Sequence, residues 1–401
     1  MNDARTPPGE LRRALGTSGA TVLGLSSILG TGIFVSLGLG AGLAGSALPF
    51  AIGLAALLAL ANGFSSAQLA AAFPVSGGTY EYGRRLLHPA AGLLAGWLFL
   101  AAKSFSAAAA AIGFGAYLGA LLGIDSEVFR RAIGVVAVGA VSTVALAGIR
   151  PSFAASAVLL AVGIGGLLVF CFAALQLDRE APAASLGTPR DIARAAALAF
   201  VAFTGYGRIA TLGEEAHDPR RTIPRAITFA VVATAALSLL VCFAALALVS
   251  PRQWYALTSS ELPPLGVLAQ HAGLGTIARI VEVAAVCALA GVLLNLVLGL
   301  SRVVFAMGRN RHLPSRLAHV NERRRTPDLT TVLVAMTVAV LAATIRLERA
   351  WTLSAATVLL YYFLTNLAAL RLPAEMRFLP RAASWIGLAG CLALAAATFL
   401  P

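Results

Sequence analysis

The stretch SSILGTGIFVSLGLG, residues 26–40, decides the fold of this chain. It lies in the first of many long apolar runs, and Gly30 and Gly32 flank Thr31 near its middle. A run of about 20 apolar residues spans a lipid bilayer as a helix. Because glycine lowers the cost of leaving helical geometry, we expect this helix to be broken there. Broken backbone at membrane depth exposes N–H and C=O groups, which is tolerated only where they line a cavity.

The rest of the chain has the same apolar character. Of its 401 residues, 59% are hydrophobic and 12% are charged, and the mean hydropathy is +0.85. A soluble domain of this size needs a larger charged surface. We therefore expect an all-α membrane protein with about eleven transmembrane helices. The predicted spans are residues 18–42, 46–72, 91–122, 130–147, 153–176, 193–213, 224–249, 276–307, 329–345, 351–370 and 382–400.

The connections between these spans alternate in charge. Arginine-rich connections lie on one side, and connections that mix basic and acidic residues lie on the other. The positive-inside rule then makes residues 1–17 a cytoplasmic N-terminal tail of a multi-pass protein in the cell (inner) membrane. These loops also explain the net charge of +13 without nucleic acid. The four cysteines lie far apart within apolar runs, so neither a metal site nor any other cofactor is expected.

A second broken helix is predicted in the sixth span, AFVAFTGYGRIATLGEE, residues 199–215. Thr204 precedes Gly205 and Gly207, which flank Tyr206. The N-terminus of a half-helix suits a carboxylate, and free carbonyls at a half-helix C-terminus suit an ammonium. The two breaks would thus hold a zwitterion by backbone alone. The alternative is that these glycines only serve close helix packing.

The two breaks also predict the domain organisation. They lie five spans apart, as an inverted five-plus-five repeat requires. We expect a ten-helix core over residues 18–371, with repeats at 18–176 and 193–371. Residues 372–401 would add a cytoplasmic loop and one further helix.

Four motifs resemble those of the amino acid–polyamine–organocation superfamily of amino acid permeases. They are ILGTGIF (28–34), FPVSGGTYEYGRR (73–85), FVAFTGYGRIATLGEEAHDPRRTIPRAI (200–227) and SRVVFAMGRNRHLP (301–314). The resemblance implies amino acid transport by alternating access. The family usually has twelve spans, and the last is missing from the prediction here, although the ten-helix core is complete.

The resemblance also assigns a substrate site to the two breaks. It implies that the N–H groups of Thr31 and Gly32 bind the substrate carboxylate. It implies that the carbonyls of three residues bind the α-amine, namely Ile28, Val201 and Thr204. The remaining candidate substrate-binding residues are Gly30, Ser106, Phe203, Gly205 and Tyr206. The aromatic pair among them, Phe203 and Tyr206, would form a gate or side-chain pocket, or else pack as ordinary core residues.

Lys103 is the only lysine in the chain and lies in the middle of the third span. Ionisable residues at this depth are costly and are functional by default. A buried lysine can release its proton near neutral pH, whereas arginine cannot. A proton-coupled branch of the family carries its lysine in the fifth span, where this chain has Gly163. We therefore hypothesise that Lys103 takes over this role, as the cation near the substrate or as a proton carrier. The alternative is a structural lysine that bonds a carbonyl.

Three charged residues after the second break, Arg208, Glu214 and Glu215, are candidates for an inner gate formed by ion pairing. The alternative is a solvated helix end. Because Gly207 stands where some arginine-handling relatives carry glutamate, we expect a neutral amino acid as substrate.

The sequence thus predicts a secondary active transporter, with an amino acid, protons and the lipid bilayer as its partners. The spans contain no cluster of histidine and acidic residues, so an enzyme is not expected. Two alternatives stay open: an uncoupled exchanger of amino acids or polyamines, and an amino acid sensor on a transporter scaffold. The sequence does not set the oligomeric state.

Overall fold

The described part of the chain is built from helices. The computed structural model describes residues 16–74, 77–124, 126–177, 186–210, 218–321 and 326–399. Within these ranges, ten helical segments are long and apolar enough to cross a membrane. An eleventh apolar helix, α14 (Asp328–Thr344), is shorter, at 17 residues. Each of the eleven predicted spans therefore corresponds to a helical segment.

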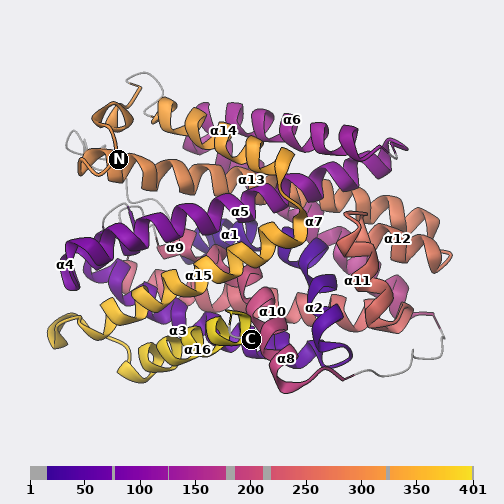
Figure 1. Ribbon diagram of the computed structural model, residues 1–401, viewed down its shortest axis with the longest axis horizontal. Helices are drawn as coiled ribbons and strands as arrows, with labels where there is room; N and C mark the ends of the chain where they lie inside the picture. The colour runs from indigo at the N-terminus through magenta and orange to yellow at the C-terminus, as the bar shows by residue number, and fades with distance from the viewer. Residues whose placement is uncertain are drawn as a thin grey trace, which may run out of the picture.

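The long helices run side by side along the longest axis of the molecule (Figure 1). The first half of the chain contains α1 (Thr17–Ile28), η1 (Gly32–Ser36), α2 (Leu37–Ala44), α3 (Leu48–Ala72), α4 (Thr79–Leu86), α5 (Pro89–Leu121), α6 (Glu127–Leu146) and α7 (Ile149–Leu175). The second half contains α8 (Pro189–Phe203), η2 (Thr204–Tyr206), α9 (Gly207–Ala210), α10 (Pro219–Leu248), α11 (Pro251–Ser259), α12 (Pro264–His271), α13 (Gly275–Arg309), η3 (Ser315–Ala318), α14, α15 (Leu347–Leu370), η4 (Ala374–Met376) and α16 (Arg381–Phe399).

Local sequence signals set where several of these helices begin. Helix α8 starts with Pro189 in its first turn, where the missing N–H of proline costs nothing. Thr188 caps this helix, and its side chain and that of Asp191 satisfy each other's backbone N–H groups. Ser250 and Gln253 make the same reciprocal cap at the start of α11. These caps therefore fix the residues at which the preceding connections end and α8 and α11 begin.

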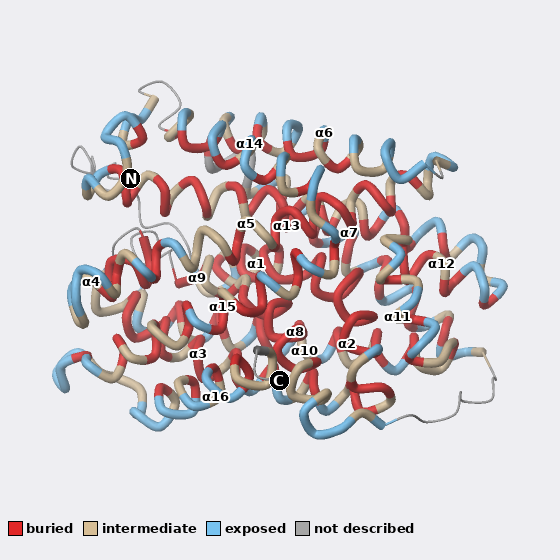
Figure 2. The backbone as a smooth tube through the Cα atoms, viewed as in Figure 1, coloured by how far each residue is buried: buried red, intermediate tan, exposed pale blue. Residues whose placement is uncertain are grey.

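The core lies in the middle of the bundle, where buried backbone from many helices gathers (Figure 2). Helix α5 packs against α13, α15 and α6, and α13 packs against α7. Five consecutive alanines of α5, residues 107–111, are completely buried. Because small side chains let helix backbones approach closely, this alanine run allows α5 to be enclosed on all sides.

The last helix, α16, packs against α3 and α15 through polar contacts inside the bundle. Ser65 of α3 shares a hydrogen bond of 2.8 Å with Ser384 of α16. The Asn62 side chain donates to the Cys391 thiol of α16 at 3.3 Å and accepts from Asn366 of α15. Buried polar groups need such partners, so these contacts fix the position of α16 on the core.

Two ends of the bundle are closed differently. At one end, the short helix α4 meets the end of α13, where the Asn310 side chain donates to the Glu81 carboxylate at 2.6 Å. At the other end, the connection from α10 to α13 folds into α11 and α12, two helices that the sequence did not predict. We call these the α4 end and the α11 end.

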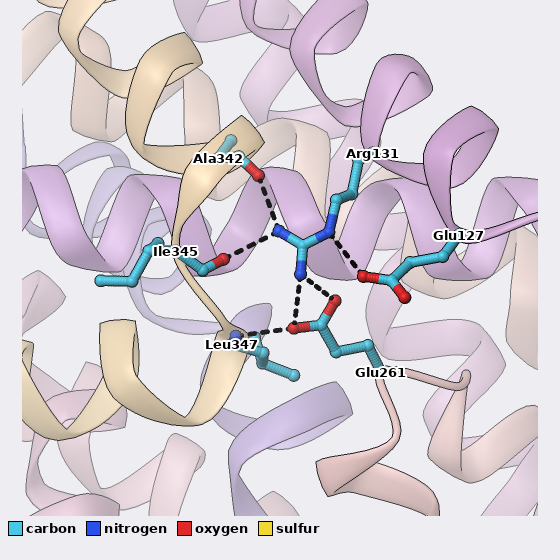
Figure 3. A network of polar contacts seen from close by, with 6 residues as sticks. All are labelled: Glu127, Arg131, Glu261, Ala342, Ile345 and Leu347. Carbon is cyan, nitrogen blue, oxygen red and sulfur yellow. Dashed lines mark hydrogen bonds and ion pairs between the residues drawn. The ribbon is translucent and has the colours of Figure 1, made fainter.

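An arginine clamp holds the α11 end together (Figure 3). Arg131 of α6 donates to both carboxylate oxygens of Glu261, at 2.9 and 3.1 Å. It also donates to the carbonyls of Ala342 and Ile345 at the end of α14. Glu261 in turn accepts from the backbone N–H of Leu347 at 2.8 Å. The clamp thus joins three regions that are distant in sequence: α6, the turn after α11, and the connection between α14 and α15.

Glu261 adopts an unfavourable backbone conformation in the clamp. Its φ of 54° lies in the left-handed region, which is unfavourable for a residue with a side chain, by roughly 1 kcal/mol. Its side chain is only 11% exposed, and that of Arg131 is 18% exposed. Bidentate, partly buried pairs of this kind are stronger than surface pairs. The hydrogen bonds to Arg131 and Leu347 therefore offset the strained backbone.

Replacing Glu261 with glutamine is expected to lower the free energy of unfolding by about 2 kcal/mol, because Arg131 would lose its buried counter-charge and keep only the exposed Glu127. The measurement is the apparent melting temperature of the purified protein in detergent, which should fall by several degrees. The control is Glu127→Gln, which removes the 65%-exposed partner of the same arginine. That variant should change stability by at most about 0.5 kcal/mol. Equal effects of the two variants would contradict the clamp.

Candidate functional site

Both predicted helix breaks are present. Helix α1 ends at Ile28, Leu29 leaves the helical conformation with a ψ of 100°, and a π-helix begins at Gly32. The Gly30 carbonyl accepts hydrogen bonds from the N–H groups of Ile33 and Phe34. Helix α8 ends at Phe203 and continues through the 3₁₀ turn η2 into α9. The backbone of both spans is therefore irregular near mid-length.

The two breaks pack directly on each other, and glycine permits this contact. A Cβ atom at Gly205 would overlap the backbone carbonyl of Ser27, and one at Gly32 would overlap Ala202. Both glycines are thus needed for close packing as well as for the breaks. Helix breaking and close helix packing, the two explanations that the sequence left open for these glycines, therefore apply together.

A small cavity lies between the breaks. The space that the centre of a water molecule can reach is about 20 Å³, and a single water needs roughly 10–15 Å³ of such space. Eight of the candidate residues line it: Ile28, Thr31, Gly32, Lys103, Ser106, Val201, Thr204 and Gly205. The rest of the lining is Ser27, Ala202, Val292, Leu296 and Trp351. The cavity is therefore contracted, with room for a water or two.

Free hydrogen-bonding groups of the first break face this cavity. The Thr31 hydroxyl is buried and has no hydrogen-bond partner among the described residues. Over the same part of the chain, the backbone N–H groups of Thr31 and Gly32 donate to no backbone oxygen. The first N–H groups of a helix are unsatisfied by the helix itself, and they attract anions.

Lys103 reaches the second break from α5. Its Nζ donates to the Thr204 hydroxyl at 2.8 Å and to the Thr204 carbonyl at 3.2 Å. The lysine is only 7% exposed. The Val201 carbonyl accepts from the Thr204 N–H and, at 2.8 Å, from the Thr204 hydroxyl. Two of the three carbonyls that the resemblance implies for an amine thus already accept protein hydrogen bonds, one of them from an ammonium.

A second cavity, of about 40 Å³ by the same measure, lies toward the α4 end. It shares Ser27, Lys103, Thr204, Gly205 and Leu296 with the first. Its further lining is Gly77, Phe99, Gly207, Arg208, Asn295, Gly299, Arg302 and Val303. Within the described residues, neither cavity is lined by a carboxylate. The Lys103–Thr204 contact therefore lies on the boundary between two cavities.

Some candidate residues lie away from the first cavity. Phe203 and Tyr206 are buried in the core, and the Tyr206 ring packs against Tyr362 with 5.3 Å between ring centres. Gly30 packs against Val292 instead of lining the cavity. Glu214 and Glu215 lie outside the described residues, so the inner-gate ion pairs stay a prediction. Arg208 lines the second cavity.

The structure explains why no lysine stands at Gly163. A Cβ atom there would lie 2.9 Å from the Cβ of Ala288, because α7 packs closely on α13. A longer side chain at this position would push the two helices apart. Lys103 reaches the second break from another helix, α5.

Sequence reasoning missed the contribution of α15 to the site. Trp351 lines the first cavity and donates from its indole N–H to the Leu198 carbonyl at 3.0 Å. The Tyr362 hydroxyl lies 3.4 Å from the Thr204 carbonyl, to which it donates. Aromatic residues with a polar group find a partner when buried, so their presence in the tenth span was an available signal.

This arrangement defines a class of protein. A bundle of membrane-length helices with two broken helices facing a central cavity is a membrane transporter fold. The family model for amino acid permeases matches residues 15–401, and the chain belongs to that family. The predicted superfamily is thus confirmed, and its members are transporters, not enzymes.

Similar proteins agree with this assignment. An uncharacterized transporter of Mycobacterium tuberculosis is 40% identical over 397 residues, covering 98% of this chain and 88% of the relative. The branched-chain amino acid permease BcaP of Bacillus subtilis is 28% identical, covering 93% and 83%. The crystal structure of MhsT in complex with L-phenylalanine matches with a TM-score of 0.68 at 13% identity, covering 97% of this chain and all of that one. This last likeness concerns the fold alone.

Replacing Gly205 with alanine is expected to separate the two breaks, because the new methyl group meets backbone of Ser27 that cannot turn away. Overpacking of this kind costs about 1–3 kcal/mol. Ligand binding should be lost and the melting temperature in detergent should fall. The matched control is Gly165→Ala in α7, where a Cβ atom has open space. If both variants bind ligand like the parent protein, the close contact is not required.

Proposed function

We propose that this permease is a secondary active transporter of neutral amino acids that couples uptake to protons through Lys103. The observation that carries the proposal is the contact between Lys103 and Thr204 on the boundary of two cavities. An ionisable side chain there touches the backbone of a broken helix, which alternating access has to move.

The first cavity offers complementary groups for the two ends of a zwitterion. The free N–H groups of Thr31 and Gly32, together with the Thr31 hydroxyl, suit a carboxylate. The carbonyls of Ile28 and Thr204 suit the α-amine, and the Thr204 carbonyl already holds one ammonium, that of Lys103. Because the cavity is contracted, substrate binding requires the Lys103 side chain to withdraw or the breaks to separate.

The remaining wall of the cavity supports a neutral, apolar side chain. Val292, Leu296 and Trp351 provide apolar surface. Among the described residues, Lys103 is the charged side chain that lines both cavities. A cationic substrate would meet this amine there, whereas a branched or aromatic side chain would pack well. The name of the B. subtilis relative, a branched-chain amino acid permease, fits this chemistry.

Proton coupling follows from the strength of the Lys103 contact. A charged donor makes stronger hydrogen bonds than a neutral one. Protonated Lys103 therefore holds the second break, and keeps the two cavities apart. Loss of its proton would weaken this hold and let the site open toward the second cavity. The two repeats, residues 18–176 and 193–371, would then move relative to each other.

The orientation in the membrane completes the proposal. The second cavity adjoins the α4 end, where Arg208 and Arg302 lie and where most arginines of the connections gather. By the positive-inside rule this end faces the cytoplasm. The N-terminus is then cytoplasmic, and a proton and substrate that enter from outside are released inward across the cell (inner) membrane.

A thermal-shift screen of the purified protein against the twenty amino acids is expected to show stabilisation by branched or aromatic neutral ones. A ligand that binds only the folded state at 100 times its dissociation constant stabilises by about 2.7 kcal/mol. Lysine and arginine should give no shift. Stabilisation by arginine alone would contradict the proposed substrate class. Binding without uptake into proteoliposomes would identify a sensor instead.

Replacing Lys103 with methionine or arginine is expected to abolish the dependence of uptake on pH. In the parent protein, uptake should rise as external pH falls, because the proton is a co-substrate. Methionine cannot bind a proton, and arginine cannot release one. The measurement is uptake into proteoliposomes across a pH gradient. The accompanying control is counterflow without any ion gradient, which Lys103→Met should retain. If uptake by both variants still depends on pH, Lys103 does not carry the proton. If uptake by the parent protein does not depend on pH but counterflow occurs, the protein is an uncoupled exchanger.

A further inference from the structure

A third cavity lies outside the transport site, between α5, α13 and α14. Its volume is about 380 Å³, whereas the cavity between the breaks has about 20 Å³. Apolar side chains form most of its wall, among them Trp97 and Phe105 of α5, Leu300 of α13, and Leu333 and Leu341 of α14. We call it the lipid-side cleft, since Trp97 and Leu333 on its edges are 50% and 39% exposed on membrane-length helices.

The length of the cleft matches one leaflet of a bilayer. Along α5 it extends from Trp97 to Phe105, and along α14 from Leu333 to Leu341. At a rise of 1.5 Å per residue, either stretch is about 12 Å long. The hydrocarbon core of a bilayer is about 30 Å thick, so that one leaflet contributes about 15 Å. On α5 the cleft covers part of the half that begins at the α4 end, and on α14 it reaches to three residues before the helix end at Thr344.

A basic segment lies at the mouth of the cleft. Leu313 and Leu317 close its α4 end, and both belong to the connection after α13. The same connection carries Arg311 and Arg316, which are exposed and form no ion pair within the described residues. Asp328 is the described acid of this region, and it already accepts from the side chains of Asn321 and Thr326. The mouth is therefore positively charged.

We propose that the lipid-side cleft binds one acyl chain of an anionic phospholipid, with the lipid phosphate on Arg311 and Arg316. Apolar walls of leaflet depth suit an acyl chain, and basic residues at the headgroup level suit a phosphate. A transmembrane helix of a partner or of a second copy fits less well. It would leave Arg311 and Arg316 at the mouth without the counter-charge that a lipid phosphate supplies.

A lipid in this cleft would act on the transport site through α5. Ser104 and Phe105 line the cleft, while the preceding residue, Lys103, reaches the second break from the same turn of the helix. An acyl chain between α5 and α14 would fill space that α5 otherwise could move into. Occupancy of the cleft would therefore restrain the helix that carries the proposed coupling residue.

The test is native mass spectrometry of the purified full chain after incubation with equal amounts of phosphatidylglycerol and phosphatidylcholine that carry the same acyl chains. The parent protein should retain phosphatidylglycerol in excess. One basic residue at a membrane surface is worth roughly a fivefold gain in affinity, and two together about 30-fold. The double variant Arg311→Glu/Arg316→Glu should lose the excess. Its matched control, Arg371→Glu/Arg381→Glu, reverses two exposed arginines at the same end but away from the cleft, and should keep it.

A second pair of variants tests the acyl chain separately. Thr337→Trp would fill the cleft from α14 and should reduce retention of both lipids, whereas Val340→Trp on the exposed face of the same helix should not. The proposal is overturned if the excess of phosphatidylglycerol survives the double arginine variant. It is also overturned if a species of twice the mass disappears in Thr337→Trp, since a second copy would then occupy the cleft. A misfolded Thr337→Trp would leave the arginine variants to decide. Both experiments measure bound lipid, so their outcomes are independent of the proposed amino acid substrate.

Discussion

The structure depends on one constraint: backbone groups that leave a helix inside a membrane must find partners in a cavity. In this permease two spans break at the same level, and the breaks touch through Gly205 and the backbone of Ser27. The freed N–H groups of Thr31 and Gly32 then face a cavity instead of lipid. Side chains of the long helices α5, α13 and α15 complete the wall of this cavity.

Beside the two breaks lies an ionisable side chain, Lys103, in largely apolar surroundings. Lys103 has an acceptor pair on Thr204, and no carboxylate is among the described residues that line the two cavities. One of its hydrogen bonds uses the Thr204 carbonyl, which we propose as a ligand of the substrate amine. In that proposal, substrate and lysine compete for, or share, one backbone group. This geometry relates the proposed proton coupling directly to substrate binding, without an intermediary network.

Much of this could be predicted from the sequence, because the relevant signals are local. Long apolar runs gave the spans, and glycine clusters gave the two breaks. Lys103 was conspicuous as the only lysine in the chain. The contribution of α15 was not predicted, since Trp351 and Tyr362 reach the site only once distant spans pack together. Helices α11 and α12 escaped prediction because they are short, and Glu261 gave no local sign that it holds a left-handed turn between them.

The position of Lys103 has a consequence for chemistry performed on the protein from outside. The chain contains no other side-chain amine, and this one is enclosed on the boundary of the two cavities. A reagent that modifies amines therefore has one internal side-chain target, which it can reach only when the structure opens around Lys103. The arginine-rich surface is inert to such reagents. The protein thus contains a built-in chemical reporter at its centre, whose rate of modification measures how often the pathway opens.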